Sequence, residues 1–125
     1  MNAIVAEWIE KAEGDFNSAQ RELRARRKPN FDAACFHSQQ CAEKYFKAFL
    51  VSRRVEPPLT HNLFELHRLC LKHDGTFEMI QPSVEALNVF AVVVRYPGMS
   101  AKKEDARFAV RAMFQVRDLV RPKIK

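Results

Sequence analysis

The sequence predicts an all-α protein, a bundle of about five helices. Glycine occurs only 3 times in 125 residues, and long segments with helical apolar periodicity are separated by short breaks. The prolines mark helix boundaries between those segments. Because 47% of the residues are hydrophobic, a chain of this length has enough apolar material for one core, and we expect residues 1–125 to form a single helical domain.

The first predicted helix runs from about Ala3 to Arg27 and has the amphipathic pattern of a surface helix. A cluster of cations ends it, followed by Pro29 and Asn30 as a stop. These cations suit the negative end of a helix dipole, which we favour over a dedicated RNA site. The apolar face comprises Val5, Trp8, Ile9, Ala12, Phe16, Ala19 and Leu23, and the cations are Arg21, Arg24, Arg26, Arg27 and Lys28.

The second predicted helix, from Asn30 or Phe31 to Arg53, is apolar almost all round, which is typical of a helix in the middle of a bundle. A single polar stripe interrupts it. Lysines buried on such a stripe need an acid or a bound anion, so the stripe either fixes helix packing or lines a cleft that binds a nucleotide phosphate. Its members are His37, Gln40, Lys44 and Lys47, with Glu43 on the edge.

Two further helices are expected before residue 95. The double proline at 57 and 58 breaks the second helix, and Thr60 is a plausible N-cap for a third helix over residues 61–73, ended by Asp74 and Gly75. A fourth helix is predicted over residues 77–94. Its β-branched end, NVFAVVV, has strand propensity, but no second strand exists to pair with it.

The last predicted helix covers about Ala101 to Val120, with Ser100 as its cap. One face is apolar. Along the other face Lys103, Arg107 and Arg111 follow one another at intervals of four residues. Like charges at that spacing repel, so this stripe is either tolerated in solvent or compensated by an acidic partner or a phosphate.

The net charge of +6 favours anionic partners, among them RNA, nucleotides and acidic proteins. The three cysteines form no CxxC pair, and the histidines at 61, 67 and 73 have the wrong spacing for a helical zinc site. We therefore expect no metal and no cofactor. No segment is as long and apolar as a secretion signal or a membrane span, which predicts a soluble, cytoplasmic protein with reduced core thiols.

Taken together, these residues resemble the HEPN family of small helical domains. The most specific piece is the pattern QQxAEKxxKA in the second helix, here Gln39, Gln40, Ala42, Glu43, Lys44, Lys47 and Ala48. The other pieces follow in order along nearly the whole chain. They are the amphipathic start from Trp8 to Leu23 with Ala12 and Asp15, the run Thr60-His61-Asn62-Leu63, and Arg95-Tyr96-Pro97.

The resemblance implies an antiparallel up-and-down bundle that usually dimerises. It also implies a role as the partner of a minimal nucleotidyltransferase in toxin–antitoxin pairs. Many members of the wider family are metal-independent ribonucleases, whose site is an arginine followed four to six residues later by a histidine. Here Arg95 stands where that arginine would be, but positions 99 to 101 are Met, Ser and Ala, and no histidine follows His73.

We therefore expect a binding module for a nucleotide, RNA or a nucleotidyltransferase, because an arginine clamps phosphates but exchanges no proton. Two alternatives stay open. One is a ribonuclease toxin in which His61 acts with Arg95; the other is a purely structural interaction dimer. The expected binding residues are Arg95, Tyr96, Gln40, Lys44, Lys47 and His61, with Lys103, Arg107 and Arg111 as a stripe for a partner or nucleic acid.

Overall fold

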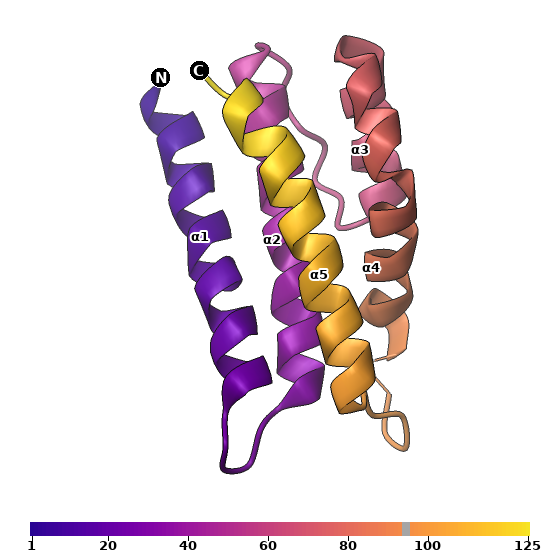
Figure 1. Ribbon diagram of the computed structural model, residues 1–125. Coiled ribbons are helices and arrows are strands. Elements are labelled where there is room, and N and C mark those ends of the chain that lie inside the picture. Colours follow the sequence, from indigo (N-terminus) through magenta and orange to yellow (C-terminus); the bar gives the residue numbers. More distant parts are fainter. Residues whose placement is uncertain (94–95) are drawn as a thin grey trace.

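A computed structural model, which describes residues 1–93 and 96–125, is a bundle of five α-helices (Figure 1). No strand occurs in these residues, so the all-α prediction is confirmed. The helices are α1 (Ala3–Arg24), α2 (Phe31–Ser52), α3 (Leu63–His73), α4 (Gln81–Val93) and α5 (Lys103–Val120), with short 3-10 helices η1 (Gly75–Ile80) and η2 (Arg121–Lys123).

Helix α2 is the centre of the bundle, as its apolar composition predicts. It packs against each of the other four α-helices, and 13 of its 22 residues are buried. Phe46 and Phe49 contact the ring of Phe77 from η1, with the Phe49 and Phe77 centroids 4.6 Å apart. None of the helices in the described residues is both long and apolar enough to cross a lipid bilayer.

The directions in which the helices run decide which loops lie at the same end of the bundle. Helix α2 runs antiparallel to α1 but parallel to α3, because the segment between α2 and α3 crosses back along the bundle (Figure 1). Gln39 accordingly lies beside His61, before α3, and the carbonyl of Phe46 lies beside Cys70, late in α3. The loop from α1 to α2 and the loop from α4 to α5 therefore lie at one end of the bundle (Figure 1).

The first helix ends three residues earlier than the predicted end at Arg27. Helix α1 stops at Arg24, and Lys28 adopts a left-handed backbone conformation with φ of 46° just before Pro29. Because a residue that precedes proline is disfavoured in the helical conformation, the chain has to leave the helix before this point. Arg26, Arg27 and Lys28 thus belong to the connecting loop.

Two predicted N-caps are wrong. The cap of α3 is Asn62, whose Oδ1 accepts a hydrogen bond from Phe64 N at 2.9 Å, whereas Thr60 accepts from Asn62 N in the turn before it. Helix α5 begins at Lys103 and not near Ser100, because the incoming chain is first tied to α2: Ala101 N donates to Asp32 Oδ1 at 2.6 Å. The N-cap of α2 at Asn30 agrees with its predicted start.

The ambiguous segment NVFAVVV is helical as far as Val93, where α4 ends. Pro82 lies in the first turn of that helix, where the missing N–H breaks no intrahelical hydrogen bond. The predicted start at Phe77 falls within η1, so the segment enters α4 through a 3-10 turn. Val94 lies outside the described residues.

The three thiols are buried and unpaired, as predicted. Cys35 and Cys41 lie in α2 and Cys70 in α3. Burial raises the pKa of Cys35 to about 12, with Asp105 and Asp32 adding to the effect, and burial raises the pKa of the other two further still. These thiols are therefore protonated packing groups at neutral pH.

Candidate functional site

The lysines of the α2 stripe find their counter-charges inside the fold. Lys44 Nζ lies 2.5 Å from Oδ2 of Asp15 on α1, and Lys47 Nζ lies 3.1 Å from Oε2 of Glu43, one turn earlier on α2. Lys47 is only 6% exposed and also lies over the ring of Trp8, 5.5 Å from its centroid. A charge this deeply buried needs such a partner, so the pairing with Glu43 is part of the packing.

Gln40 of the stripe and its neighbour Gln39 are also hydrogen-bonded within the fold. Gln40 Nε2 donates to Gln39 Oε1 at 2.8 Å, and Gln39 Nε2 donates to the carbonyl of His61 at 3.2 Å. On the other side, His37 Nδ1 lies 2.8 Å from Oδ1 of Asp15, the carboxylate that also holds Lys44. The stripe thus ties α2 to α1 on one side and to the chain before α3 on the other.

His61, in the segment before α3, contacts the stripe through a side chain that is largely open to solvent. Its Nδ1 lies 3.1 Å from Oε2 of the buried Glu43, while 71% of the side chain is exposed. The other ring nitrogen, Nε2, has no hydrogen-bond partner among residues 1–93 and 96–125. A histidine held at one nitrogen by a carboxylate and open at the other has the geometry of an acid/base group.

The arginine expected to act with that histidine is not placed. Arg95 lies outside the described residues, so its distance from His61 or from the α2 stripe is not part of this structure. Tyr96 is described and is 59% exposed. It belongs to the loop between α4 and α5, at the same end of the bundle as the loop between α1 and α2 (Figure 1).

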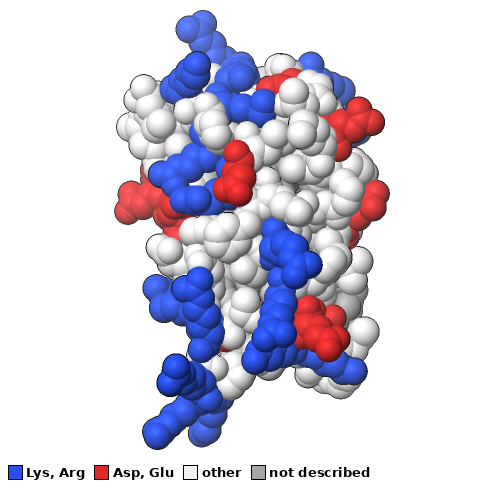
Figure 2. Space-filling view, viewed as in Figure 1, with Lys and Arg blue, Asp and Glu red and all other residues white. Residues whose placement is uncertain are grey.

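Two basic clusters far apart in the sequence meet at that end. Lys103, Arg107 and Arg111 are all exposed on α5, as predicted. The first two share a hollow of about 570 Å³ with Arg24 and Arg26 from the end of α1, and no carboxylate lines it. Figure 2 shows blue side chains gathered here over the end of α1 and the first half of α5. The other lining residues are Leu23, Ala25, Pro29 and Phe31.

The sequence indicated both clusters but not their meeting. Each was interpreted alone, the α1 cluster as a dipole-compensating helix end and the α5 residues as a solvated or partner-binding stripe. The missing information is that α2 and α5 run parallel and start at the same end, where Asp32 contacts Ala101. Since the loop from α1 leads into the start of α2, the end of α1 must then lie beside the start of α5.

Comparison with known proteins gives two matches. A family model described as HEPN domain matches residues 5–123. The crystal structure of an archaeal HEPN homologue superposes with a TM-score of 0.73 at 24% sequence identity, over 97% of this chain and 98% of that chain. Comparison with curated proteins gives no match. The fold is thus shared with that homologue.

Proposed function

Since the chain belongs to the HEPN domain family, we propose that it is a nucleotide- or RNA-binding module of that family that lacks the Arg-to-His nuclease motif. The observation that carries this proposal is the basic hollow between α1 and α5, with Arg24, Arg26, Lys103 and Arg107 around it. None of these four has a carboxylate within salt-bridge distance in the described part of the chain. Like charges brought together without acids favour a phosphate ligand.

Outside the α1–α5 hollow, several lysines are already paired with carboxylates, and this favours the hollow as the phosphate site. Lys44 and Lys47 already have Asp15 and Glu43, and at the opposite end of the bundle Lys123 pairs with Asp74. A phosphate bound at the α2 stripe would have to compete with a carboxylate that is already in place. The α1–α5 hollow requires no such exchange, so we place phosphate binding there first.

Binding rather than cleavage follows from the proton chemistry. RNA cleavage without a metal needs a group that takes the 2′-hydroxyl proton and a group that protonates the leaving oxygen. The chain has no histidine after His73, and the guanidinium of Arg95 stays charged. Arg95 and Tyr96 then serve as further contacts to the ligand from the α4–α5 segment.

One observation favours a second candidate function, a ribonuclease. The contact between Glu43 and His61 holds the imidazole in place with Nε2 open to solvent. In that function His61 would take and return the proton while a cation such as Arg95 holds the phosphate. We rank it second because the two lysines of the α2 stripe are already paired with Asp15 and Glu43, the second of which is also the carboxylate that His61 contacts.

The partner expectations derive from the family resemblance. A homodimer, and a minimal nucleotidyltransferase of a toxin–antitoxin type pair, are both consistent with exposed apolar side chains such as Phe36, Phe64 and Phe108. A purely structural dimer is the third candidate function. It differs from the first in one measurable respect: its partner binding would not depend on salt.

The proposal is tested by titrating fluorescent RNA and nucleotides with the wild-type protein and with the double variant Arg24→Glu/Arg107→Glu. We expect the variant to bind RNA at least about tenfold more weakly, because two positive charges at the proposed site become negative and the net charge falls by four units. Arg68→Glu/Lys72→Glu, on α3, is the matched control and should bind like wild type. If the wild type binds none of the RNAs and nucleotides at low salt, the proposal is wrong.

The same titration compares the binding residues first expected from the sequence. Arg95→Ala should weaken binding as a phosphate contact. Lys44→Ala should leave binding unchanged and lower stability instead, because its ammonium is paired with Asp15. A loss of RNA affinity in folded Lys44→Ala would move the site to the α2 stripe.

A further inference from the structure

We propose that the ligand is a single-stranded nucleic acid whose backbone follows a curved path, the basic track, around the end of α1. This inference rests on the proposed function and specifies its ligand class. The basic track consists of three hollows, of which the α1–α5 hollow is the middle one. It includes six cations: Arg21, Arg24, Arg26, Lys28, Lys103 and Arg107.

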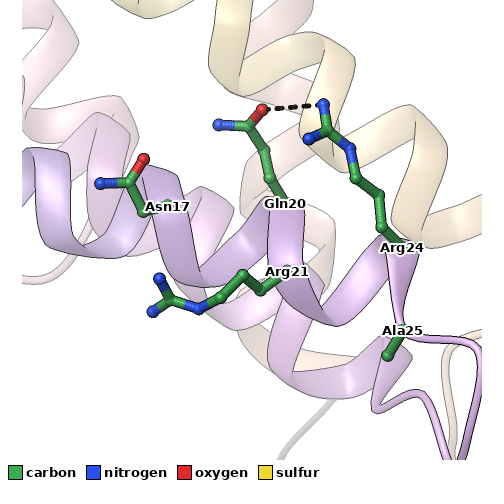
Figure 3. Close-up of a pocket in the computed structure, with 5 residues that line it drawn as sticks. All are labelled: Asn17, Gln20, Arg21, Arg24 and Ala25. Atoms are coloured by element: carbon green, nitrogen blue, oxygen red, sulfur yellow. Dashed lines mark hydrogen bonds between the residues drawn. The ribbon is translucent and has the colours of Figure 1, made fainter.

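The three hollows lie next to one another, because neighbouring ones share lining residues. The first, about 340 Å³, lies on α1 and shares Arg24 and Ala25 with the middle hollow (Figure 3). The third, about 310 Å³, lies at the start of α2 and shares Pro29 and Phe31 with the middle hollow. Successive phosphates of one chain can therefore reach hollows that lie next to one another.

The charge along the basic track is almost uncompensated. In residues 1–93 and 96–125 none of the six cations has a carboxylate within 4.0 Å. The one acid in the lining is Asp32, and its Oδ1 accepts the hydrogen bond from Ala101 N.

Neutral side chains hold two of the guanidinium groups in place. Arg24 Nη2 donates to Gln20 Oε1 at 3.2 Å (Figure 3), and Arg21 Nη2 donates to Ser18 Oγ at 3.2 Å. These partners orient the two arginines without neutralising them. Both groups keep donors for phosphate oxygens, since a guanidinium has five N–H bonds.

The shape of the basic track favours a single strand over a duplex. Its cations come from three segments, namely α1, the loop after it and α5, so they do not lie along the face of one straight helix. A duplex is stiff over about 150 base pairs, and its backbone would contact only part of such a curve. A single strand bends at each nucleotide and can place successive phosphates in successive hollows.

One aromatic side chain, that of Phe31, lies between the middle and the third hollow. Phe31, the first residue of α2, is half-buried and lines both the middle and the third hollow. Non-specific single-strand sites combine a basic groove with aromatic rings on which bases stack. Since the charged contacts go to phosphates, we expect little dependence on base sequence.

The test measures fluorescence anisotropy with a 12-nucleotide single-stranded RNA, its DNA equivalent and a 12-base-pair blunt duplex. We expect both single strands to bind at least about tenfold more tightly than the duplex. Arg21→Glu and Lys28→Glu, in the outer hollows, should each weaken single-strand binding several-fold, whereas Arg68→Glu should not. Phe31→Leu, which keeps an apolar side chain, should weaken binding at least about fivefold through lost stacking. Circular dichroism confirms that each variant is folded.

The outcomes separate this inference from the proposed function. Duplex binding as tight as single-strand binding overturns the basic track while the binding module stands. Loss of affinity in Arg107→Glu with no effect of Arg21→Glu or Lys28→Glu confines the ligand to the middle hollow and likewise overturns the track. No binding of any of the three ligands by the wild type overturns the proposed function itself.

Discussion

Arg117 on α5 holds Glu13 on α1 through two parallel hydrogen bonds, from Nε and Nη2 to the two carboxylate oxygens, each 2.8 Å long. Arg121 adds a third bond at 2.9 Å, and the hydroxyl of the buried Tyr45 also donates to this carboxylate. The contact joins the two helices whose ends form the basic hollow. It therefore helps to set the distance between the cations of α1 and those of α5.

Glu13→Gln should destabilise the protein at neutral pH and weaken its response to acid. The bonds from Arg117, followed by the bond from Tyr45, lower the pKa of Glu13 from 4.5 to about 2. Between these values the unfolded chain binds a proton that the folded chain does not, so stability falls as pH drops from about 4.5 to about 2. Allowing for the partial exposure of Glu13, we expect a loss of about 1–2 kcal/mol at pH 7.

Urea unfolding at pH 7, 5, 4 and 3 checks this prediction. The wild type should lose more stability than Glu13→Gln between pH 5 and pH 3. Asp74, whose pKa is also lowered to about 2 by Thr76 and Lys123, is present in both proteins and does not distinguish them. Parallel pH profiles for the two proteins would contradict the role given to Glu13.

Glu43→Gln should be strongly destabilising because it leaves the Lys47 ammonium buried without its carboxylate. Breaking one partner of a buried ion pair costs about 3–5 kcal/mol. Adding Lys47→Met to Glu43→Gln should restore much of the loss, since the unpaired charge is then gone. Chemical denaturation of the two single variants and the double variant measures the coupling. Strict additivity of the two substitutions would show that the pair does not act as a unit.

Asn62→Ala should cost about 1 kcal/mol and Thr60→Ala less, because Asn62 caps α3 and Thr60 does not. Asn62 is exposed and Thr60 is half-buried, and neither residue belongs to the buried core. Thermal and urea unfolding of the two variants gives the comparison directly. A larger loss of stability for Thr60→Ala than for Asn62→Ala would indicate that Thr60 is the N-cap of α3, as first expected from the sequence.

The RNA affinity should fall linearly on a log–log plot as salt concentration rises, because phosphate contacts release counterions. Neutralising Arg24 or Arg107 with glutamine should reduce the slope by about 0.7 for each lost contact to a single strand. The control Arg68→Gln should keep the wild-type slope. An affinity that does not change with salt would favour the purely structural dimer.

Highly purified protein should leave structured and unstructured RNA intact over hours. The reason is that His61 contacts the α2 stripe through Glu43, and both lysines of that stripe are already paired with carboxylates, so neither is free to hold the phosphate. Cleavage that disappears in His61→Ala and in Arg95→Ala would establish the second candidate function, the ribonuclease. Cleavage unchanged in both variants would come from a contaminant.

The sequence by itself determined the fold class and the central position of α2. Apolar periodicity is local, so the residues that face the core of each helix are visible without knowing what covers them. Val5, Ala12, Phe16 and Ala19 are all buried on α1 as that pattern predicts. Helix ends are less well determined because a cap depends on the path of the incoming chain, which placed Asn62 rather than Thr60 at the start of α3.

Only the tertiary structure decided which charges are neutralised. The sequence shows cations both on the α2 stripe and at the end of α1, yet Lys44 is paired with Asp15 from α1, while Arg24 and Arg107 line one hollow that no acid lines. The physical reason is that Coulomb energies depend on distances of a few ångströms between segments that are remote along the chain. Helix packing sets those distances, and with them the surface that remains open to an anionic ligand.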